Sequence, residues 1–198
     1  GLEKPTPVTT TATTATYNVP QARAGEWAVL VGTPLPLTGV MAKFKQPLTD
    51  VRVMVEELPA RPPQIGPEPI IGGRPGKVNS YIRIELPEAP LGAIEVGHIR
   101  FQVEKSWLKA NNIHKWSVTL SRYDADRGAW LALPTKRVEE DATRVYYTAT
   151  TPQFSVFAIW GSPEMAPQEF QVSQVEIGPA IAGPSPEGRA GPSCRRAG

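Results

Sequence analysis

Few side chains in this sequence stand at spacings that could support chemistry. His98 and His114 lie far apart, and neither has a second base or metal ligand at the short spacings that catalytic and metal-binding motifs use. We therefore expect each histidine to lie at the surface or to have its hydrogen bonds satisfied within the fold. The sequence predicts no metal site and no bound cofactor.

Acidic residues cluster twice without forming a recognisable site. Asp124 and Asp126 are spaced like the first ligands of a calcium loop, but the glutamate that closes such a loop is missing, so we expect a hairpin tip. Residues 139–141 (EED) place three carboxylates side by side. A glycosidase needs two carboxylates facing each other across a cleft, which adjacent residues do not provide. We interpret this run as a solvated turn.

Nucleophile and phosphate-binding motifs are also missing from the sequence. There is no Gly-x-Ser-x-Gly elbow, and the glycine-rich stretch 72–76 (GGRPG) has a proline where a phosphate loop needs a free N–H group. We expect that the protein is not an enzyme.

The composition excludes further classes of function. The 198 residues include 21 Lys and Arg against 19 Asp and Glu, and a net charge of +2 gives no footprint for nucleic acid. No apolar run reaches the length of about 18 residues that a membrane-spanning helix needs. Hydrophobic residues make up 40 % of the chain, enough for a sizeable core, while 22 prolines interrupt any long helix.

Alternation of apolar and polar residues dominates the middle of the chain. It is clearest at 51–55, 82–86, 99–103 and 116–120. This period of two predicts antiparallel strands with one face on a core. Only 105–112 has a helical pattern, and it is short. The fold class that we predict is all-β: an antiparallel β-sandwich, immunoglobulin-like or jelly-roll-like, with one short helix and extended N- and C-terminal arms.

Changes in composition divide the chain into three parts. We predict a Thr/Pro-rich extended arm at 1–25, a β-sandwich domain at 26–177 and a Gly/Pro-rich tail at 178–198, with an alternating strand pattern at 169–177. The Pro/Gly-rich stretch 59–76 predicts a long loop, and loops of this length are functional, packed against a partner or disordered.

The N-terminal arm has two interpretations. It is either a flexible stalk or a strand donated to the sheet edge of a neighbouring subunit. For the second, the side chains expected to contact the neighbour are Val8, Thr10, Thr14, Tyr17 and Val19. The tail holds the single cysteine, Cys194, which cannot form an internal disulfide and either pairs between subunits or remains a free thiol.

A series of short motifs runs through residues 96–161: VEKSWLKANNI, VTLSRY, a tryptophan at 130, LPT, VYYTATT and TPQFSVFAIWG. In order and spacing this series resembles the PGF-pre-PGF domain family of archaeal-type cell-surface proteins. The resemblance implies an extracellular β module without known enzymatic activity. Members often carry a Pro-Gly-Phe sorting signal, an apolar helix and basic residues after the domain, and this sequence has neither the tripeptide nor the apolar helix.

The large side chains of these motifs are expected to be structural, because aromatic residues bury large areas and dominate cores. We expect the following residues to build the core: Trp107, Leu108, Trp116, Tyr123, Trp130, Phe154 and Phe157.

These observations predict a structural extracellular protein. We expect a self-assembling subunit of a cell-surface filament, pilus or surface layer, a homo-polymer held by strand donation from the N-terminal arm, and located at the cell surface after removal of a signal peptide. Cell-envelope components are possible partners, and nucleic acid is not. The alternative is a non-catalytic cell-surface module that binds a carbohydrate or a protein.

Overall fold

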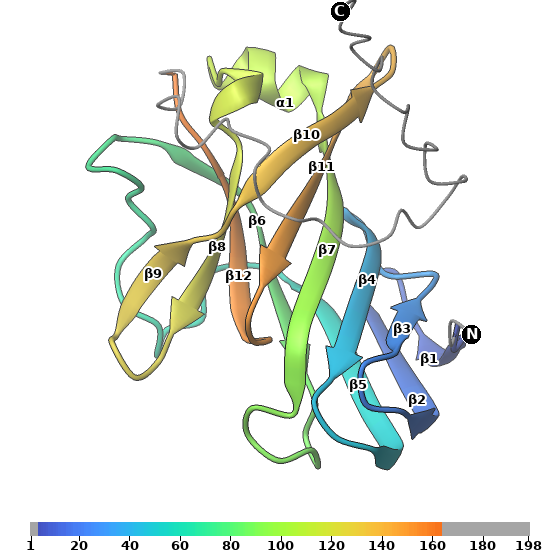
Figure 1. The fold of residues 1–198 in the computed structure, drawn as a ribbon. Helices are drawn as coiled ribbons and strands as arrows, with labels where there is room; N and C mark the ends of the chain where they lie inside the picture. Colours follow the sequence, from blue (N-terminus) through green and yellow to red (C-terminus); the bar gives the residue numbers. More distant parts are fainter. Residues whose placement is uncertain (1–3, 164–198) are drawn as a thin grey trace, which may run out of the picture.

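Two antiparallel β-sheets face each other and enclose the core between them (Figure 1). The computed structural model describes residues 4–163. Side chains of a strand point alternately to the two sides of its sheet, so each period-two stretch of the sequence sends its apolar side inward. The predicted all-β sandwich is confirmed.

Among the described residues, one sheet has seven strands and the other has five. In spatial order, the seven-stranded sheet contains β1 (Pro7–Thr10), β2 (Thr14–Ala22), β5 (Leu48–Leu58), β6 (Lys77–Glu85), β12 (Val156–Gly161), β8 (Thr119–Asp124) and β9 (Ala129–Ala132). The five-stranded sheet contains β10 (Thr135–Glu140), β11 (Arg144–Thr151), β7 (Ile94–Glu104), β4 (Leu37–Phe44) and β3 (Trp27–Leu30). All strand pairs within the two sheets are antiparallel.

Large aromatic side chains fill the space between the sheets. Phe101 and Tyr147 stack with their ring centroids 5.2 Å apart, and Phe157 is fully buried on the opposite sheet. Two tyrosines buried between the sheets have satisfied hydroxyl groups: Tyr17 donates to Val31 O at 2.8 Å, and Tyr147 donates to the carbonyl oxygen of Lys115 at 2.7 Å. Each buried side chain of this size contributes roughly 1.5–3 kcal/mol through apolar burial.

A short helix follows the longest strand of the five-stranded sheet. Helix α1 (Lys105–Ala110) directs Leu108 and Trp107 against the core, and the 3₁₀ turn η1 (Lys115–Ser117) follows it. The chain leaves the helix through Asn112, whose φ of 52° lies in the left-handed region that asparagine tolerates at a helix end. This is the short helix that the sequence predicts.

The N-terminal segment differs from the prediction. Strand β2 pairs with β5 of the same chain along its length, and both Tyr17 and Val19 are fully buried in the core. The predicted boundary at residue 25 between arm and sandwich is therefore wrong for β2. Ala15, Tyr17 and Val19 alternate like any core strand, and the surrounding threonines obscured that pattern.

The predicted strand at 169–177, the tail at 178–198 and the thiol of Cys194 lie outside the described residues, so these interpretations stay predictions.

Candidate binding pocket and the predicted site residues

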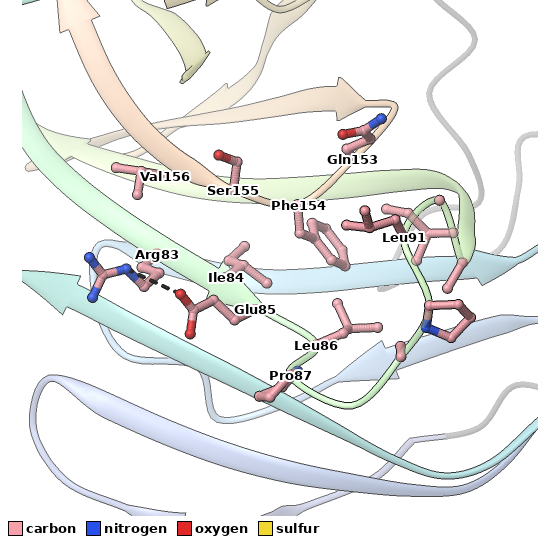
Figure 2. Close-up of a pocket in the computed structure, with 15 residues that line it drawn as sticks. Arg83, Ile84, Glu85, Leu86, Pro87, Leu91, Gln153, Phe154, Ser155 and Val156 are labelled. Atoms are coloured by element: carbon pink, nitrogen blue, oxygen red, sulfur yellow. Dashed lines mark ion pairs between the residues drawn. The ribbon is translucent and has the colours of Figure 1, made fainter. Parts of the chain in front are cut away.

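Two connections at one end of the sandwich frame a pocket of about 490 Å³ (Figure 2). One is the β6–β7 connection, residues 86–93, and the other is the β11–β12 connection, residues 152–155. The ends of β6 and β12 form the floor. Pockets of a few hundred cubic ångströms suit small ligands or a few side chains of a partner.

The β6–β7 connection is built from two successive turns. Ala89 N donates to Leu86 O at 3.2 Å, and Ala93 N donates to Pro90 O at 3.1 Å. The second turn needs a positive φ at its third residue, and Gly92 supplies it with φ of 72°. Prolines at 87 and 90 restrict the unfolded chain further. This wall of the pocket is therefore formed before any ligand arrives.

Apolar side chains line the interior of the pocket. Ile84, Ile94 and Val156 are buried residues of the lining, and the ring of half-buried Phe154 lies beside Ile84 (Figure 2). Leu91 is fully exposed at the rim, on the tip of the second turn. A leucine held there in water exposes apolar area that a ligand would bury.

Charged residues occupy one side of the rim. Arg83 lies 3.4 Å from a carboxylate oxygen of Glu85 and 3.7 Å from one of Glu56, so two carboxylates share one guanidinium group. Ser155 is not available to a ligand as a donor, because its hydroxyl group donates to Tyr123 O at 2.9 Å. The rim thus carries the Arg83–Glu85 ion pair beside an apolar interior, and the second carboxylate on Arg83, that of Glu56, lies outside the lining.

The large side chains of the sequence motifs divide between three places. Leu108 and Phe157 are buried between the sheets as predicted, Trp107 packs against that core, and Phe154 does so while also lining the pocket. Trp116 contradicts the prediction: its side chain is 39 % exposed, and the Arg137 guanidinium carbon lies 4.4 Å from its ring centroid. It sits in η1 at the margin of the sandwich, so its ring meets a cation rather than the core.

Tyr123 and Trp130 also differ from the prediction. They lie on the outer face of the seven-stranded sheet, in a second apolar cluster with Tyr81 and Leu58, rather than between the sheets. The long loop 59–76 reaches this face, where Trp130 Nε1 donates to Pro67 O at 2.8 Å. Of the three interpretations of that loop, none anticipated packing against the chain's own sheet.

Both histidines have partners within the fold. His98 is buried on the outer side of β7, with its ring centroid 4.6 Å from that of Trp27. Burial, and after it the positive charges of Lys43 and Arg100, together lower the pKa of His98 to about 4. His114 Nδ1 accepts a hydrogen bond from Trp116 N at 3.2 Å at the start of η1. The expectation of satisfied histidines is confirmed.

One aspartate of each acidic cluster organises a turn, but Glu139 and Glu140 end strand β10, so the predicted turn at 139–141 is wrong for these two residues. Asp124 Oδ1 accepts from the backbone N–H groups of Asp126 and Arg127 at the β8–β9 hairpin. Asp141 accepts hydrogen bonds from the side chain of Tyr146 and from backbone N–H groups, which lower its pKa to about 2. Within residues 4–163, no group of three or more histidine, cysteine or acidic side chains is placed to hold a metal ion. In the same span, no helix has the length and apolar character needed to cross a membrane.

Comparison with known proteins adds no relative: no family model, no curated protein and no solved structure matches this chain. The resemblance to the PGF-pre-PGF family over residues 96–161 therefore stays a prediction.

Proposed function

We propose that this chain is a non-catalytic module of an extracellular cell-surface protein, which binds a protein ligand through the pocket between the β6–β7 and β11–β12 connections. The observation that carries the proposal is this pocket of about 490 Å³, with an apolar interior and a rigid double-turn wall. A site that needs no ordering on binding loses less entropy when its ligand arrives.

The lining selects the class of ligand. Phe154, Ile84 and Leu91 offer apolar surface, and the rim offers the carboxylate of Glu85 beside Arg83. An aromatic or branched aliphatic side chain of a ligand would fill the apolar interior, and a neighbouring lysine or arginine would pair with the carboxylate at the rim. A neutral sugar would find one neutral polar side chain in the lining, that of Gln153, because the hydroxyl group of Ser155 is already bonded.

The edges of the sheets favour ligand binding over strand donation. Within residues 4–163, edge strands β1, β9 and β3 have four residues each, and the remaining edge strand, β10, carries Lys136, Arg137 and Glu139. Short or charged edges are devices that hinder pairing with another chain. With β2 buried in its own sheet, the strand-donating form of self-assembly loses its expected donor.

The test is protein-observed NMR with two ligand panels: short peptides with one aromatic or branched aliphatic residue beside a lysine, and neutral oligosaccharides. We expect peptides to shift the signals of Leu91, Ala93 and Phe154, and oligosaccharides to leave them unchanged. Leu91→Glu should abolish the shifts. Val138→Glu is the matched control, because Val138 is exposed on β10 and does not line the pocket.

Two results would contradict the proposal in different ways. Shifts caused only by oligosaccharides would keep the pocket as a binding site and overturn its ligand class. Peptide shifts that persist in Leu91→Glu, or no shifts with either panel, would overturn the pocket as the site.

Self-assembly is the second candidate function, and one observation favours it. Val8 is 71 % exposed on edge strand β1, whose outer edge has no partner strand among residues 4–163. An unpaired edge with an exposed valine can pair with a second copy. Electron microscopy and light scattering of the full chain should then show filaments or sheets that Val8→Lys prevents. A monomer of 21.5 kDa would contradict this candidate.

A further inference from the structure

Three aromatic rings form a continuous surface on the outer side of the seven-stranded sheet. We call Tyr81, Tyr123 and Trp130 the aromatic face. The ring centroid of Trp130 lies 6.0 Å from that of Tyr81 and 5.4 Å from that of Tyr123, so the three rings are in contact. They come from β6, β8 and β9, in the half of the sheet away from β1. A sheet face that carries three such rings needs a cover to keep them out of water.

A proline-rich segment of the same chain supplies the cover. Residues 59–70 read PARPPQIGPEPI. Pro62 is buried, and Ile65 packs against the cluster that contains the aromatic face. Trp130 Nε1 donates to Pro67 O at 2.8 Å. A Cβ atom built on Gly66 would lie 4.0 Å from the hydroxyl oxygen of Tyr123, which places the segment beside that side chain.

Hydrogen bonds within the segment stabilise its conformation, and few hydrogen bonds attach it to the sheet. The guanidinium group of Arg61 donates to the carbonyl oxygens of Ile65 and Gly66, and Ile65 N donates to Pro62 O at 3.0 Å. Within the described part of the chain, the bond from Trp130 is the single hydrogen bond between residues 59–70 and the sheet. The remaining attachment is apolar contact.

The sheet retains hydrogen-bonding capacity beneath this cover. Tyr81 Oη and Ser121 Oγ are buried, and neither makes a hydrogen bond within the described residues. Both residues flank Ala158 of β12, so they lie in one row across the sheet. Buried polar atoms are nearly always bonded, so a better-fitting occupant or trapped water could satisfy both groups.

We propose that the aromatic face is a docking surface for proline-rich peptide segments, and that residues 59–70 occupy it as an internal ligand that a proline-rich segment of a partner protein displaces. Aromatic surfaces with an indole N–H donor recognise proline-rich chains, because proline offers rigid apolar rings and strong carbonyl acceptors. The internal segment lowers the apparent affinity for the partner, since only the fraction of molecules with an open face can bind.

The experiment uses the full chain with residues 60–72 replaced by a glycine-serine linker of equal length. The probe is the synthetic peptide of residues 59–70, and its control has all prolines replaced by alanine. Provided the circular dichroism spectrum stays native, we expect the loop-replaced chain to bind the probe at least tenfold more tightly than the unmodified chain. It should prefer the probe over the alanine peptide, and adding Trp130→Phe should weaken binding by about two- to tenfold through loss of one hydrogen bond. A folded variant that does not bind, or binds both peptides equally, would overturn the proposal.

A second measurement works on the unmodified chain if the loop replacement prevents folding. At millimolar concentration the probe should increase amide hydrogen exchange across residues 59–70, and leave strands β5 and β7 unchanged. Unchanged exchange of 59–70 under saturating probe would overturn displacement. Light scattering in the same experiment detects exchange of the segment between two copies of the chain. Such exchange would give a dimer and overturn the partner assignment, whereas binding of a separate peptide would leave a monomer.

Discussion

Phe154 lies against the bare backbone of Gly97, and this contact joins the pocket to the five-stranded sheet. A Cβ atom on residue 97 would come within 2.7 Å of Phe154 Cε1 and 3.0 Å of Thr151 Cγ2. Real Cβ atoms do not approach so closely, so only glycine allows the ring to stand where it forms the pocket wall.

We expect Gly97→Ala to destabilise the protein by about 1–3 kcal/mol, because the added methyl group forces Phe154 or Thr151 to move in a packed region. Urea unfolding followed by fluorescence would measure the change. Gly66→Ala is the matched control: position 66 has an ordinary φ, and a Cβ atom added there would lie 3.9 Å or more from its nearest neighbours, so stability should stay within about 0.5 kcal/mol. Equal effects of the two substitutions would contradict the packing argument.

Tyr17 tests whether the N-terminal strand is a core element or an arm. Its ring is fully buried and its hydroxyl group is bonded to Val31 O. Tyr17→Ala should cost about 3–5 kcal/mol, the range for removing a large buried aromatic side chain. A separate arm would instead tolerate the change with no loss of stability. Val8→Ala, on the exposed edge strand, is the comparison and should alter the free energy of unfolding by less than about 0.5 kcal/mol.

Local pattern predicted most of the fold. The strands around Val53, Ile84, Phe101 and Leu120 follow from period-two alternation, and the short helix follows from its apolar pair and terminal asparagines. The threonine-rich start predicts an arm, because threonine suits exposed edges and stalks as well as sheets. Whether a β-strand pairs within its own chain or with another depends on contacts distant in sequence, which a local pattern does not contain.

The candidate site was less predictable. The pocket brings Ile84, Leu91 and Phe154 together from connections that are far apart along the chain. Trp130 looked like a core residue because large aromatic side chains usually lie between sheets. A signal for its true place was present in the long proline-rich loop, which needs an apolar surface if it is to be ordered.

His98 should make the stability of the protein depend on pH. Its pKa is lowered from 6.5 to about 4 by burial first and then by the charges of Lys43 and Arg100, while Trp27 covers the ring and Thr150 contacts Nδ1. Because the folded state holds the imidazole neutral, its contribution is complete above the unfolded pKa of about 6.5. It is lost progressively as the pH falls towards 4.

The size of this loss is up to about 3 kcal/mol, from roughly 1.4 kcal/mol for each unit of pKa shift. Urea unfolding between pH 7 and pH 4 should show a decline that is reduced in His98→Gln. Carboxylates such as Glu57, whose pKa is raised by burial, also titrate at the acid end of this range. The contribution of His98 is therefore the difference in free energy of unfolding between the unmodified chain and His98→Gln. Parallel pH profiles of the two proteins would contradict the assignment.

Trp130→Phe should loosen the proline-rich loop while leaving the sandwich folded. The substitution keeps an aromatic ring in contact with Tyr81 and Tyr123 but removes the N–H group that donates to Pro67 O. A hydrogen bond of this kind contributes about 0.5–1.5 kcal/mol, so local opening of residues 59–70 should become about two- to tenfold more frequent. Limited proteolysis would report this as faster cleavage within the loop.

Trp116→Phe is the control, because Trp116 contacts Arg137 rather than the loop, and its cleavage rate should match that of the unmodified chain. Equal cleavage of all three proteins would mean that the bond to Pro67 does not hold the loop in place.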